Sequence, residues 1–242
     1  MVMANKKTLI VTGASHGIGA AILQAFLDRG YNVVGTARNM SNAGFAPSQQ
    51  LALVDGDIGD AATAEDVTRA AMTNFGSIDH VVNSAGIYSS KPFTEYTADE
   101  FHRFVSTNLE GFIFITRLAV KQMLAQGTGG SVTTITAALA DNPIAGSPAS
   151  IPMITKGGLN AVTLSLANEY AKNQIRFNAV APGVVDTPLH KGTSKELLMA
   201  QSPMGTATSP EDIAQAVVYL VEAIHVTGEV LHVDGGAHVG RW

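Results

Sequence analysis

Short apolar runs alternate with longer amphipathic segments along the whole chain. Thr8–Thr12 is a run of β-branched residues and leucine, which is typical of a strand buried on both faces. In the next segment, Gly17–Arg29, apolar residues such as Ile22 and Phe26 recur at helical spacing, and Gly30 stands where helices commonly end. The opening of the chain therefore predicts a strand, a turn and a helix.

The same alternation continues to the end of the chain. Further strands are predicted at Asn32–Ala37, Leu51–Asp55, Ile78–Asn83, Gly130–Thr136, Arg176–Ala181 and Glu229–Val233. Further helices are predicted at Ala64–Phe75, Thr97–Met123, Pro152–Lys172 and Pro210–Glu222. Strands separated by helices form a parallel sheet with both faces covered. Since 242 residues suit one large domain, we predict a single α/β domain over residues 1–242, with a Rossmann-type doubly wound sheet.

One long segment lacks helical or strand periodicity near a predicted strand end. Residues 189–208 are rich in turn-forming and small residues, and they follow the carboxyl end of the strand at Arg176–Ala181. Ligands of open α/β sheets bind outside the carboxyl ends of the strands. We therefore predict a substrate lid at 189–208.

Composition and charge exclude several classes of protein. Hydrophobic residues make up 46% of the chain and charged residues 14%, so a sizeable core can be buried and disorder is excluded. The formal net charge is −5 and there is no basic run, so neither nucleic acid nor an anionic membrane is expected as a partner. No apolar run reaches the roughly 18 residues that span a bilayer. These features favour a small-molecule substrate.

The absence of cysteine has chemical consequences. It excludes disulfides, a thiolate nucleophile and cysteine-ligated metals. The seven histidines show no spacing typical of metal ligands, and no GxSxG elbow is present, so neither a metal nor serine hydrolase chemistry is expected. The N-terminal residues Met1–Lys7 are short and polar, without the pattern of a signal peptide. We therefore expect a cytoplasmic protein.

A glycine-rich turn joins the first predicted strand to the first predicted helix. Gly13 permits a tight turn, Gly17 lets the backbone approach a pyrophosphate, and Gly19 lets the helix pack on the strand. A helix N-terminus adds free N–H groups and a positive dipole end for phosphates. In this strand–turn–helix context the alternative, a glycine-rich turn without a ligand, is disfavoured. We predict a dinucleotide site with contacts from Gly13, Ser15, His16, Gly17, Ile18 and Gly19.

The end of the second predicted strand indicates which dinucleotide binds. NAD sites usually place an acidic residue there for the ribose hydroxyls, but this chain has Ala37 followed by Arg38. A guanidinium holds a 2′-phosphate through its planar fork, and a protonated His16 would help. We therefore predict NADP(H) in preference to NAD(H), although Arg38 as a solvated surface residue is the alternative. Asp57 is a candidate for the adenine edge, with turn capping as its alternative.

Six motifs in order resemble those of the short-chain dehydrogenase/reductase family over nearly the full chain. They are Thr12–Gly19 for the TGxxxGIG loop, Asn83-Ser84-Ala85-Gly86 for NNAG, Asn108 for the helix asparagine, Arg176–Gly183 for IRVNAVxPG, Thr187 for the threonine that contacts the nicotinamide carboxamide, and Thr227–Glu229 with Val233–Gly236 for TGxxxxVDGG. The resemblance implies a seven-stranded parallel sheet, hydride transfer at nicotinamide C4, and a homo-oligomer, usually a tetramer, with a dimer as the alternative. It assigns catalytic roles to Asn108 and Lys156, and cofactor contacts to Asn83, Ala85, Gly86, Lys156, Pro182, Gly183 and Thr187.

The chain departs from the family at two catalytic positions. The family signature is Tyr-x-x-x-Lys, whose i, i+4 spacing places both side chains on one helix face. The lysine, which binds the nicotinamide ribose, is present as Lys156, but Pro152 stands four residues earlier. Ala137 aligns with the family's serine, and the neighbouring Thr136 would point to the opposite side if the strand continued. Neither replacement carries a dissociable proton.

Three interpretations remain open. In the first, which we favour, the protein is an NADP(H)-dependent oxidoreductase that reduces a carbonyl, an imine or an activated alkene with another acid: Lys156 with a lowered pKa, Tyr88, His190 or ordered water. A packed loop aromatic and a solvated histidine are the structural alternatives for Tyr88 and His190. In the second, the protein is a catalytically inactive dinucleotide-binding regulatory or structural protein. In the third, the replacement of the family's tyrosine and serine accommodates a different reaction.

Overall fold

Seven parallel strands form one sheet, and its order explains where the site lies. The computed structural model describes residues 6–144, 146–187, 199 and 202–239. The strands are β1 (Thr8–Thr12), β2 (Asn32–Ala37), β3 (Leu51–Asp55), β4 (His80–Asn83), β5 (Gly130–Ile135), β6 (Ile175–Pro182) and β7 (Val230–Val233), in the order β3-β2-β1-β4-β5-β6-β7. The order reverses between β1 and β4, so a crevice opens at the carboxyl ends of these two strands. The predicted doubly wound, seven-stranded α/β domain is confirmed.

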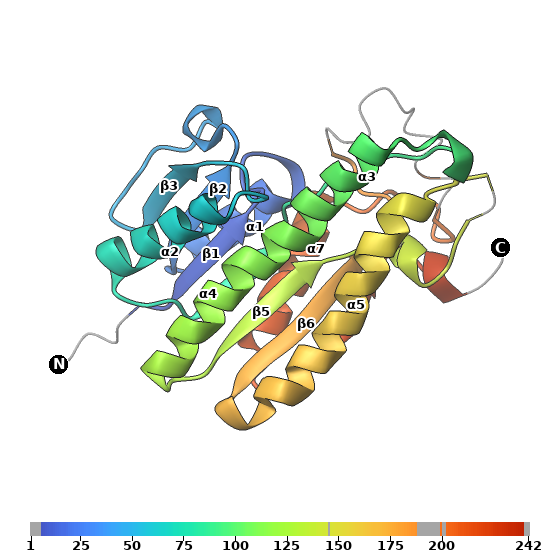
Figure 1. Ribbon diagram of the computed structural model, residues 1–242. Helices are drawn as coiled ribbons and strands as arrows, with labels where there is room; N and C mark the ends of the chain where they lie inside the picture. Colours follow the sequence, from blue (N-terminus) through green and yellow to red (C-terminus); the bar gives the residue numbers. More distant parts are fainter. Residues whose placement is uncertain (1–5, 145, 188–198, 200–201, 240–242) are drawn as a thin grey trace.

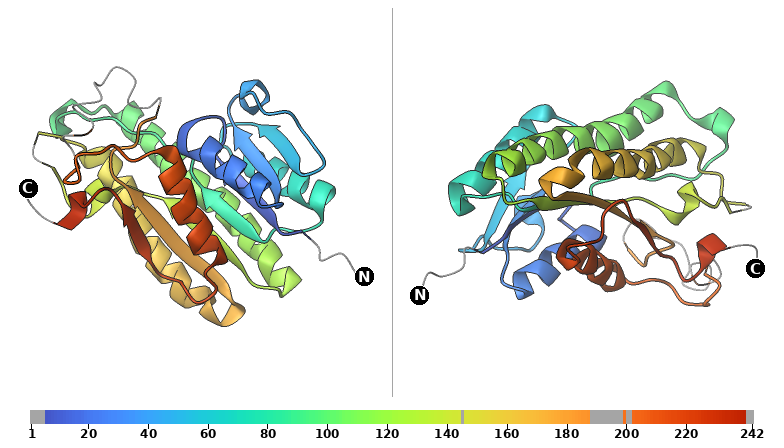
Figure 2. Two further views of the ribbon diagram at one scale, coloured as in Figure 1. Left: turned by 180° about the vertical axis from the view of Figure 1, so that it is seen from behind. Right: turned by 90° about the horizontal axis from the view of Figure 1, so that it is seen from below.

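Helices cover both faces of the sheet (Figures 1 and 2). One layer contains α1 (Gly17–Asp28) and α7 (Pro210–Glu222), and the other contains α2 (Ala61–Phe75), α4 (Gly111–Gln126) and α5 (Ser150–Tyr170). A shorter helix, α3 (Ala98–Phe104), precedes α4. Each layer encloses its own apolar core, because consecutive side chains of a strand point to opposite faces. Within β1, for example, Leu9 packs in one core and Ile10 in the other.

The long helical stretch predicted at Thr97–Met123 is confirmed, but it is not regular α-helix throughout. The chain forms α3, then a π-helical segment at Val105–Glu110, and then α4, which ends at Gln126. A π-segment inserts about one extra residue into a helix, so the apolar periodicity on either side still looks helical. The segment contains Asn108, and π-bulges are frequent at functional sites.

Several other helix and strand boundaries differ from the predicted ones. Ile78 lies outside β4 because both its backbone N–H and its carbonyl bond to the side-chain amide of Gln126. Helix α2 begins three residues earlier than predicted, since the carboxylate of Asp60 caps it by accepting from the N–H of Ala62. Strand β5 ends at Ile135 rather than Thr136, and α5 begins at Ser150 rather than Pro152.

The predicted lid falls mainly outside the described residues. Within 189–208 the structure describes only Met199 and residues 202–208, and His190 lies outside the described part. On either side of the gap, Val185 forms a parallel bridge with Thr208. In the described part of the chain, no helix is long and apolar enough to cross a membrane.

Candidate active site

The glycine-rich turn brings two backbone segments into close contact. Gly13 and Gly17 both have left-handed φ angles, of 66° and 56°, which favour glycine. A Cβ on Gly13 would lie 2.7 Å from the Cα of Ala85, and a Cβ on Gly19 would lie 2.1 Å from the carbonyl oxygen of Gly13. The turn therefore packs main chain against main chain on both sides, which only glycine allows.

The N-terminus of α1 is open and carries no acidic side chain in its first turn. The residue before the helix, His16, is exposed and makes no capping bond, while its Nδ1 lies 2.8 Å from the hydroxyl of Ser15. Unpaired N–H groups, a positive dipole end and the absence of a side chain at three glycines suit a diphosphate. The residues present therefore fit the dinucleotide that the sequence predicts.

The segment after β4 is fixed to this turn. The hydroxyl of Thr12 accepts hydrogen bonds from the N–H groups of Ser84 and Ala85, both at 3.1 Å. Asn83 is 5% exposed and donates from Nδ2 to the hydroxyl of Thr116 at 3.0 Å, so its side chain ties β4 to α4. Asn83 thus holds the scaffold, Ala85 packs its main chain against Gly13, and Gly86 lines the crevice.

Two residues predicted to contact the nucleotide's adenosine half lie on the surface. Arg38 is exposed directly after β2, at the carboxyl edge of the sheet. Asp57 is also exposed, and its carboxylate accepts from the N–H of Gly59 at 3.0 Å. Asp57 therefore performs the turn-capping role that was the alternative to an adenine contact.

Asn108 connects three parts of the site. Its Oδ1 accepts from the N–H of Ile87 at 2.9 Å, and its Nδ2 donates to the carbonyl of Ile87 at 3.2 Å and to the hydroxyl of Thr155 at 2.9 Å. The Thr155 hydroxyl in turn donates to the carbonyl of Pro152 at 2.7 Å. The amide of Asn108 therefore sets the position of the loop after β4 relative to α5.

Lys156 reaches from α5 into the crevice. Its Nζ donates to the carbonyl of Ile135 at 2.7 Å, and a Cβ on Gly86 would lie 3.1 Å from Nζ. Burial lowers the pKa of Lys156 from 10.5 to about 8, because the surrounding protein solvates the ammonium less well than water does. No salt bridge to Lys156 occurs among the residues that the structure describes.

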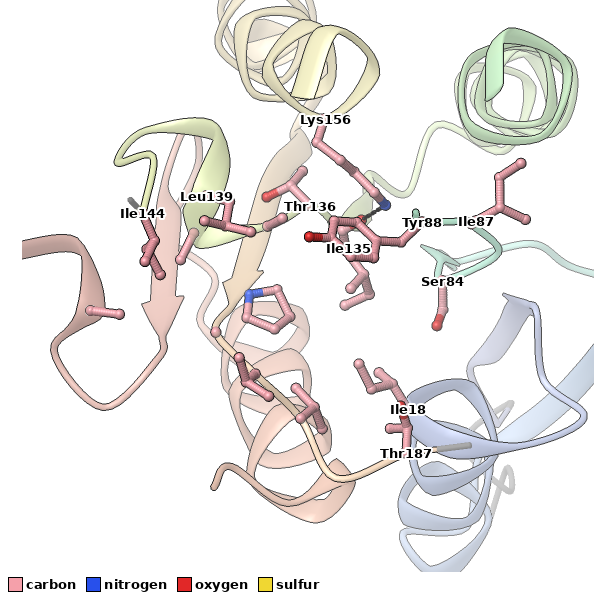
Figure 3. A pocket seen from close by; sticks show the side chains of 18 of the residues that line it. Ile18, Ser84, Ile87, Tyr88, Ile135, Thr136, Leu139, Ile144, Lys156 and Thr187 are labelled. Atoms are coloured by element: carbon pink, nitrogen blue, oxygen red, sulfur yellow. Dashed lines mark hydrogen bonds between the residues drawn. The ribbon is translucent and has the colours of Figure 1, made fainter. Parts of the chain in front are cut away.

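A cavity of about 180 Å³ opens beside Lys156 (Figure 3). Apolar side chains make up most of its wall, and in Figure 3 Lys156 and Tyr88 point into the same space. Burial raises the pKa of the Tyr88 phenol. Several residues predicted for the site line this cavity: Ile18, Gly86, Tyr88, Ala137, Lys156, Pro182, Gly183 and Thr187. The structure thus brings together residues from five separate stretches of the chain.

Neither position 152, four residues before Lys156, nor position 137, two residues after the end of β5, carries a protic side chain. Pro152 is buried in the first turn of α5, where the missing N–H costs no helical hydrogen bond. Ala137 lines the cavity. Thr136 also lines it, contrary to the expected alternation, because β5 has already ended. The hydroxyl of Thr136 donates to the carbonyl of Val180 at 3.3 Å.

Sequence reasoning missed three contributors to the site. Thr12 and Thr155 are buried hydroxyls whose partners lie 72 and 47 residues away, so no local pattern reveals these contacts, although Thr12 belongs to the quoted glycine-rich motif. Thr136 was assigned to the wrong side because the end of β5 was placed one residue too late. Among the described residues, no group of three or more His, Asp or Glu side chains is arranged to hold a metal ion.

Comparison with known proteins agrees with this geometry. Residues 13–238 match the family described as enoyl-(acyl carrier protein) reductase. L-rhamnose 1-dehydrogenase (NAD(P)(+)) of a Sphingomonas strain is 33% identical over 253 residues, which cover 99% of both chains. The chain belongs to the short-chain dehydrogenase/reductase family.

Solved structures of this fold are closely similar. ElxO with NADP bound has a TM-score of 0.88 at 27% identity, covering 97% of this chain and 100% of that one. The 3-ketoacyl-(acyl-carrier-protein) reductase of Brucella melitensis complexed with NADH has a TM-score of 0.89 at 27% identity, with the same coverage. Since homologues are dehydrogenases and reductases, an oxidoreductase that binds a nicotinamide dinucleotide is the class that fold and site define.

Proposed function

We propose that the protein is an NADP(H)-dependent oxidoreductase in which Pro152 and Ala137 occupy the positions of the family's catalytic tyrosine and serine. The observation that carries the proposal is the position of Lys156. Its Nζ lies at the carbonyl of Ile135, in the crevice that the glycine-rich turn and the segment after β4 border. A lysine held there with no acidic partner among the described residues suits the hydroxyls of a nicotinamide ribose.

Each part of the site has a distinct role in this proposal. The amides of the turn from Gly13 to Gly19 bind the diphosphate, Arg38 pairs with a 2′-phosphate, and Thr187 with Pro182 and Gly183 borders the nicotinamide. When bound, the cofactor supplies a hydride to the substrate. Asn108 acts as a positioning residue, because its amide is engaged with Ile87 and Thr155 rather than with the cavity.

Cofactor preference provides the first test. We expect NADPH to raise the melting temperature more than NADH at equal concentration, because only a ligand that binds the folded state stabilises it. Arg38→Ala should weaken NADPH binding by roughly 10- to 150-fold, the range for one charge-assisted hydrogen bond, and leave NADH binding unchanged. Arg69→Ala is the matched control, since Arg69 is an exposed arginine of α2 that pairs with Asp66. A larger effect of NADH in the wild-type protein would refute the NADP preference.

A second candidate function is that of a catalytically inactive dinucleotide-binding protein. Its support is the absence of a dissociable proton on the side chains of Ala137 and Pro152. Following NADPH absorbance with a panel of ketones, imines and activated alkenes separates the two functions. Turnover of any member that exceeds the rate without protein identifies an enzyme. Tight NADPH binding without turnover identifies a binding protein.

We propose that the protein forms a homo-oligomer through α4 and α5. These two helices carry the large apolar side chains Ile113, Leu124, Ile154 and Leu164, which are 51%, 41%, 54% and 55% exposed. Apolar surface of this kind is typical of an interface between copies. Light scattering of the wild-type protein should give a dimer or tetramer mass, and Ile154→Glu should reduce it.

Two further expectations belong to the same proposal. A lid at 189–208 would become resistant to proteolysis when cofactor and substrate analogue are added. A cytoplasmic location would be tested by cell fractionation.

A further inference from the structure

Several side chains that line the cavity beside Lys156 carry a hydrogen atom on nitrogen or oxygen. Reduction of a carbonyl group needs such a side chain, because hydride addition leaves negative charge on the oxygen, and a positioned acid normally neutralises it. The bonds that each group already makes indicate which of them can act as that acid. Among the described lining residues the candidates are Ser84, Tyr88, Thr136, Asn142, Lys156 and Thr187.

Three of these groups already donate to backbone carbonyls. Thr136 donates through its hydroxyl at 3.3 Å, Asn142 through its amide, and Lys156 through its ammonium at 2.7 Å. The proposed function uses the other N–H groups of the ammonium for the ribose. The two aliphatic hydroxyls that remain are much weaker acids than a phenol, whose ordinary pKa is about 10. The phenol of Tyr88 is therefore the strongest candidate.

The side chain of Tyr88 has the orientation and the protonation state that a proton donor needs. Its ring reaches into the cavity from the loop after β4, and Lys156 enters the same space from α5 (Figure 3). Burial raises the pKa of the Tyr88 phenol, and the opposing effect of the Ser90 hydroxyl is smaller. Tyr88 therefore carries its proton throughout the neutral pH range.

The loop that carries Tyr88 is fixed on both sides of this residue. Before it, Oδ1 of Asn108 accepts from the N–H of Ile87 at 2.9 Å, and Nδ2 donates to the carbonyl of the same residue at 3.2 Å. After it, the hydroxyl of Ser90 donates to the carbonyl of Pro148 at 2.9 Å. A side chain on a backbone held in this way needs little reorganisation before it reacts.

The amide of Asn108 also relates Tyr88 to Lys156. Its Nδ2 donates to the hydroxyl of Thr155 at 2.9 Å. Thr155 directly precedes Lys156 on α5, just as Ile87 directly precedes Tyr88 on the loop after β4. One buried side chain therefore fixes the backbone beside both residues, which sets the two walls of the cavity relative to each other.

We propose that Tyr88 is a catalytic residue that donates its hydroxyl proton to the oxygen of a ketone or aldehyde substrate. The inference rests on the proposed NADP(H)-dependent function. The carbonyl carbon gains the hydride that NADPH supplies, the π electrons of the carbonyl group move to its oxygen, and that oxygen bonds to the phenol proton. The substrate is thereby reduced to an alcohol while NADPH is oxidised to NADP⁺. Water then returns a proton to the phenolate.

Reduction of cyclohexanone and other ketones by Tyr88→Phe with NADPH tests the proposal. We expect kcat to fall at least ~10²-fold, the lower end of what a general acid contributes, while KM and the Kd for NADPH stay within a few-fold of wild type. Tyr219→Phe is the matched control and should keep the wild-type kcat, since Tyr219 is 56% exposed on α7. A wild-type kcat in Tyr88→Phe would overturn the proposal and assign the proton to Lys156.

A second substrate separates proton donation from a structural role. The N-methyl-dihydroisoquinolinium ion accepts a hydride at its iminium carbon and becomes a neutral amine, so its reduction needs no proton. We expect Tyr88→Phe to reduce this ion at a rate within a few-fold of wild type. A parallel loss of iminium and ketone reduction would show that the phenol only maintains the shape of the cavity, and would refute proton donation.

The two proposals fail in different ways. Absence of NADPH binding in a fluorescence titration would reject the proposed function. A wild-type protein that binds NADPH and reduces the iminium ion but no ketone would remain an oxidoreductase, and only the role of Tyr88 would be rejected.

Discussion

Replacing Lys156 with methionine should stabilise the protein while removing its cofactor binding. Burial lowers the pKa of Lys156 from 10.5 to about 8, so the folded state disfavours the charged amine relative to the unfolded chain. A difference of this size corresponds to about 3 kcal/mol at most. Methionine has a similar length, carries no charge and fills irregular spaces well.

The hydrogen bond to Ile135 works in the opposite direction. Its carbonyl accepts from Nζ at 2.7 Å, and losing a hydrogen bond of this kind costs about 1 kcal/mol. We therefore expect Lys156→Met to raise the free energy of unfolding by about 2 kcal/mol at pH 7. Urea unfolding followed by circular dichroism measures it, with Lys121→Met as a control that should stay within 0.5 kcal/mol of wild type.

The pH dependence gives a sharper test. Between about pH 8 and pH 10.5 the unfolded chain keeps the proton on Lys156 that the folded protein has released, so the stability of the wild-type protein rises with pH in this window. The free-energy cost of burying the charged Lys156 amine is fully present below pH 8 and has disappeared above pH 10.5. The stability difference between Lys156→Met and wild type should therefore shrink across this window. A difference that is independent of pH, or a variant less stable than wild type at pH 7, would refute the reasoning.

Three more substitutions test other parts of the structure. Gly13→Ala should destabilise the protein by more than 1 kcal/mol in urea unfolding and abolish NADPH binding, since its φ is 66° and a Cβ would contact the backbone of Ala85. In a Tyr88→Phe background, Pro152→Tyr should raise cyclohexanone reduction at least ~10²-fold by supplying the missing acid, and an unchanged rate would contradict the assignment of this position. Burial lowers the pKa of His80 from 6.5 to about 4, so wild-type stability should be lost as the pH falls through this range, whereas His80→Asn should show a flatter profile in acid unfolding.

Much of the fold was predictable because the inner strands of the sheet, such as β1, are buried on both faces. Such strands read as continuous apolar runs, and β1, β2 and β3 were predicted to the residue. One of the boundaries that moved depends on a contact between distant residues. Ile78 is excluded from β4 by the side chain of Gln126, which lies 48 residues away, and no local pattern contains that information.

The candidate site was predictable where the backbone conformation requires a particular residue. Positive φ angles and close approaches demand glycine, so Gly13, Gly17 and Gly19 are visible in the sequence. Roles that depend on side-chain partners were not predictable. Asp57 caps a turn, and Asn83 bonds to Thr116 inside the protein. In these cases a motif gives the residue type, but only the folded chain shows which way the polar group points.

The close contacts of Gly13 with Ala85 and Gly19 have a consequence for the evolution of this protein. The predicted nucleotide cradle is formed largely by main chain where β1 and β4 lie side by side, so its shape depends little on side chains from other elements. The residues proposed to decide the reaction, Ala137 and Pro152, come from the segment after β5 and from the first turn of α5. If the proposed roles hold, substitutions at these two positions would change the reaction while leaving the nucleotide-binding main chain unchanged, so the same scaffold could acquire a different activity during evolution.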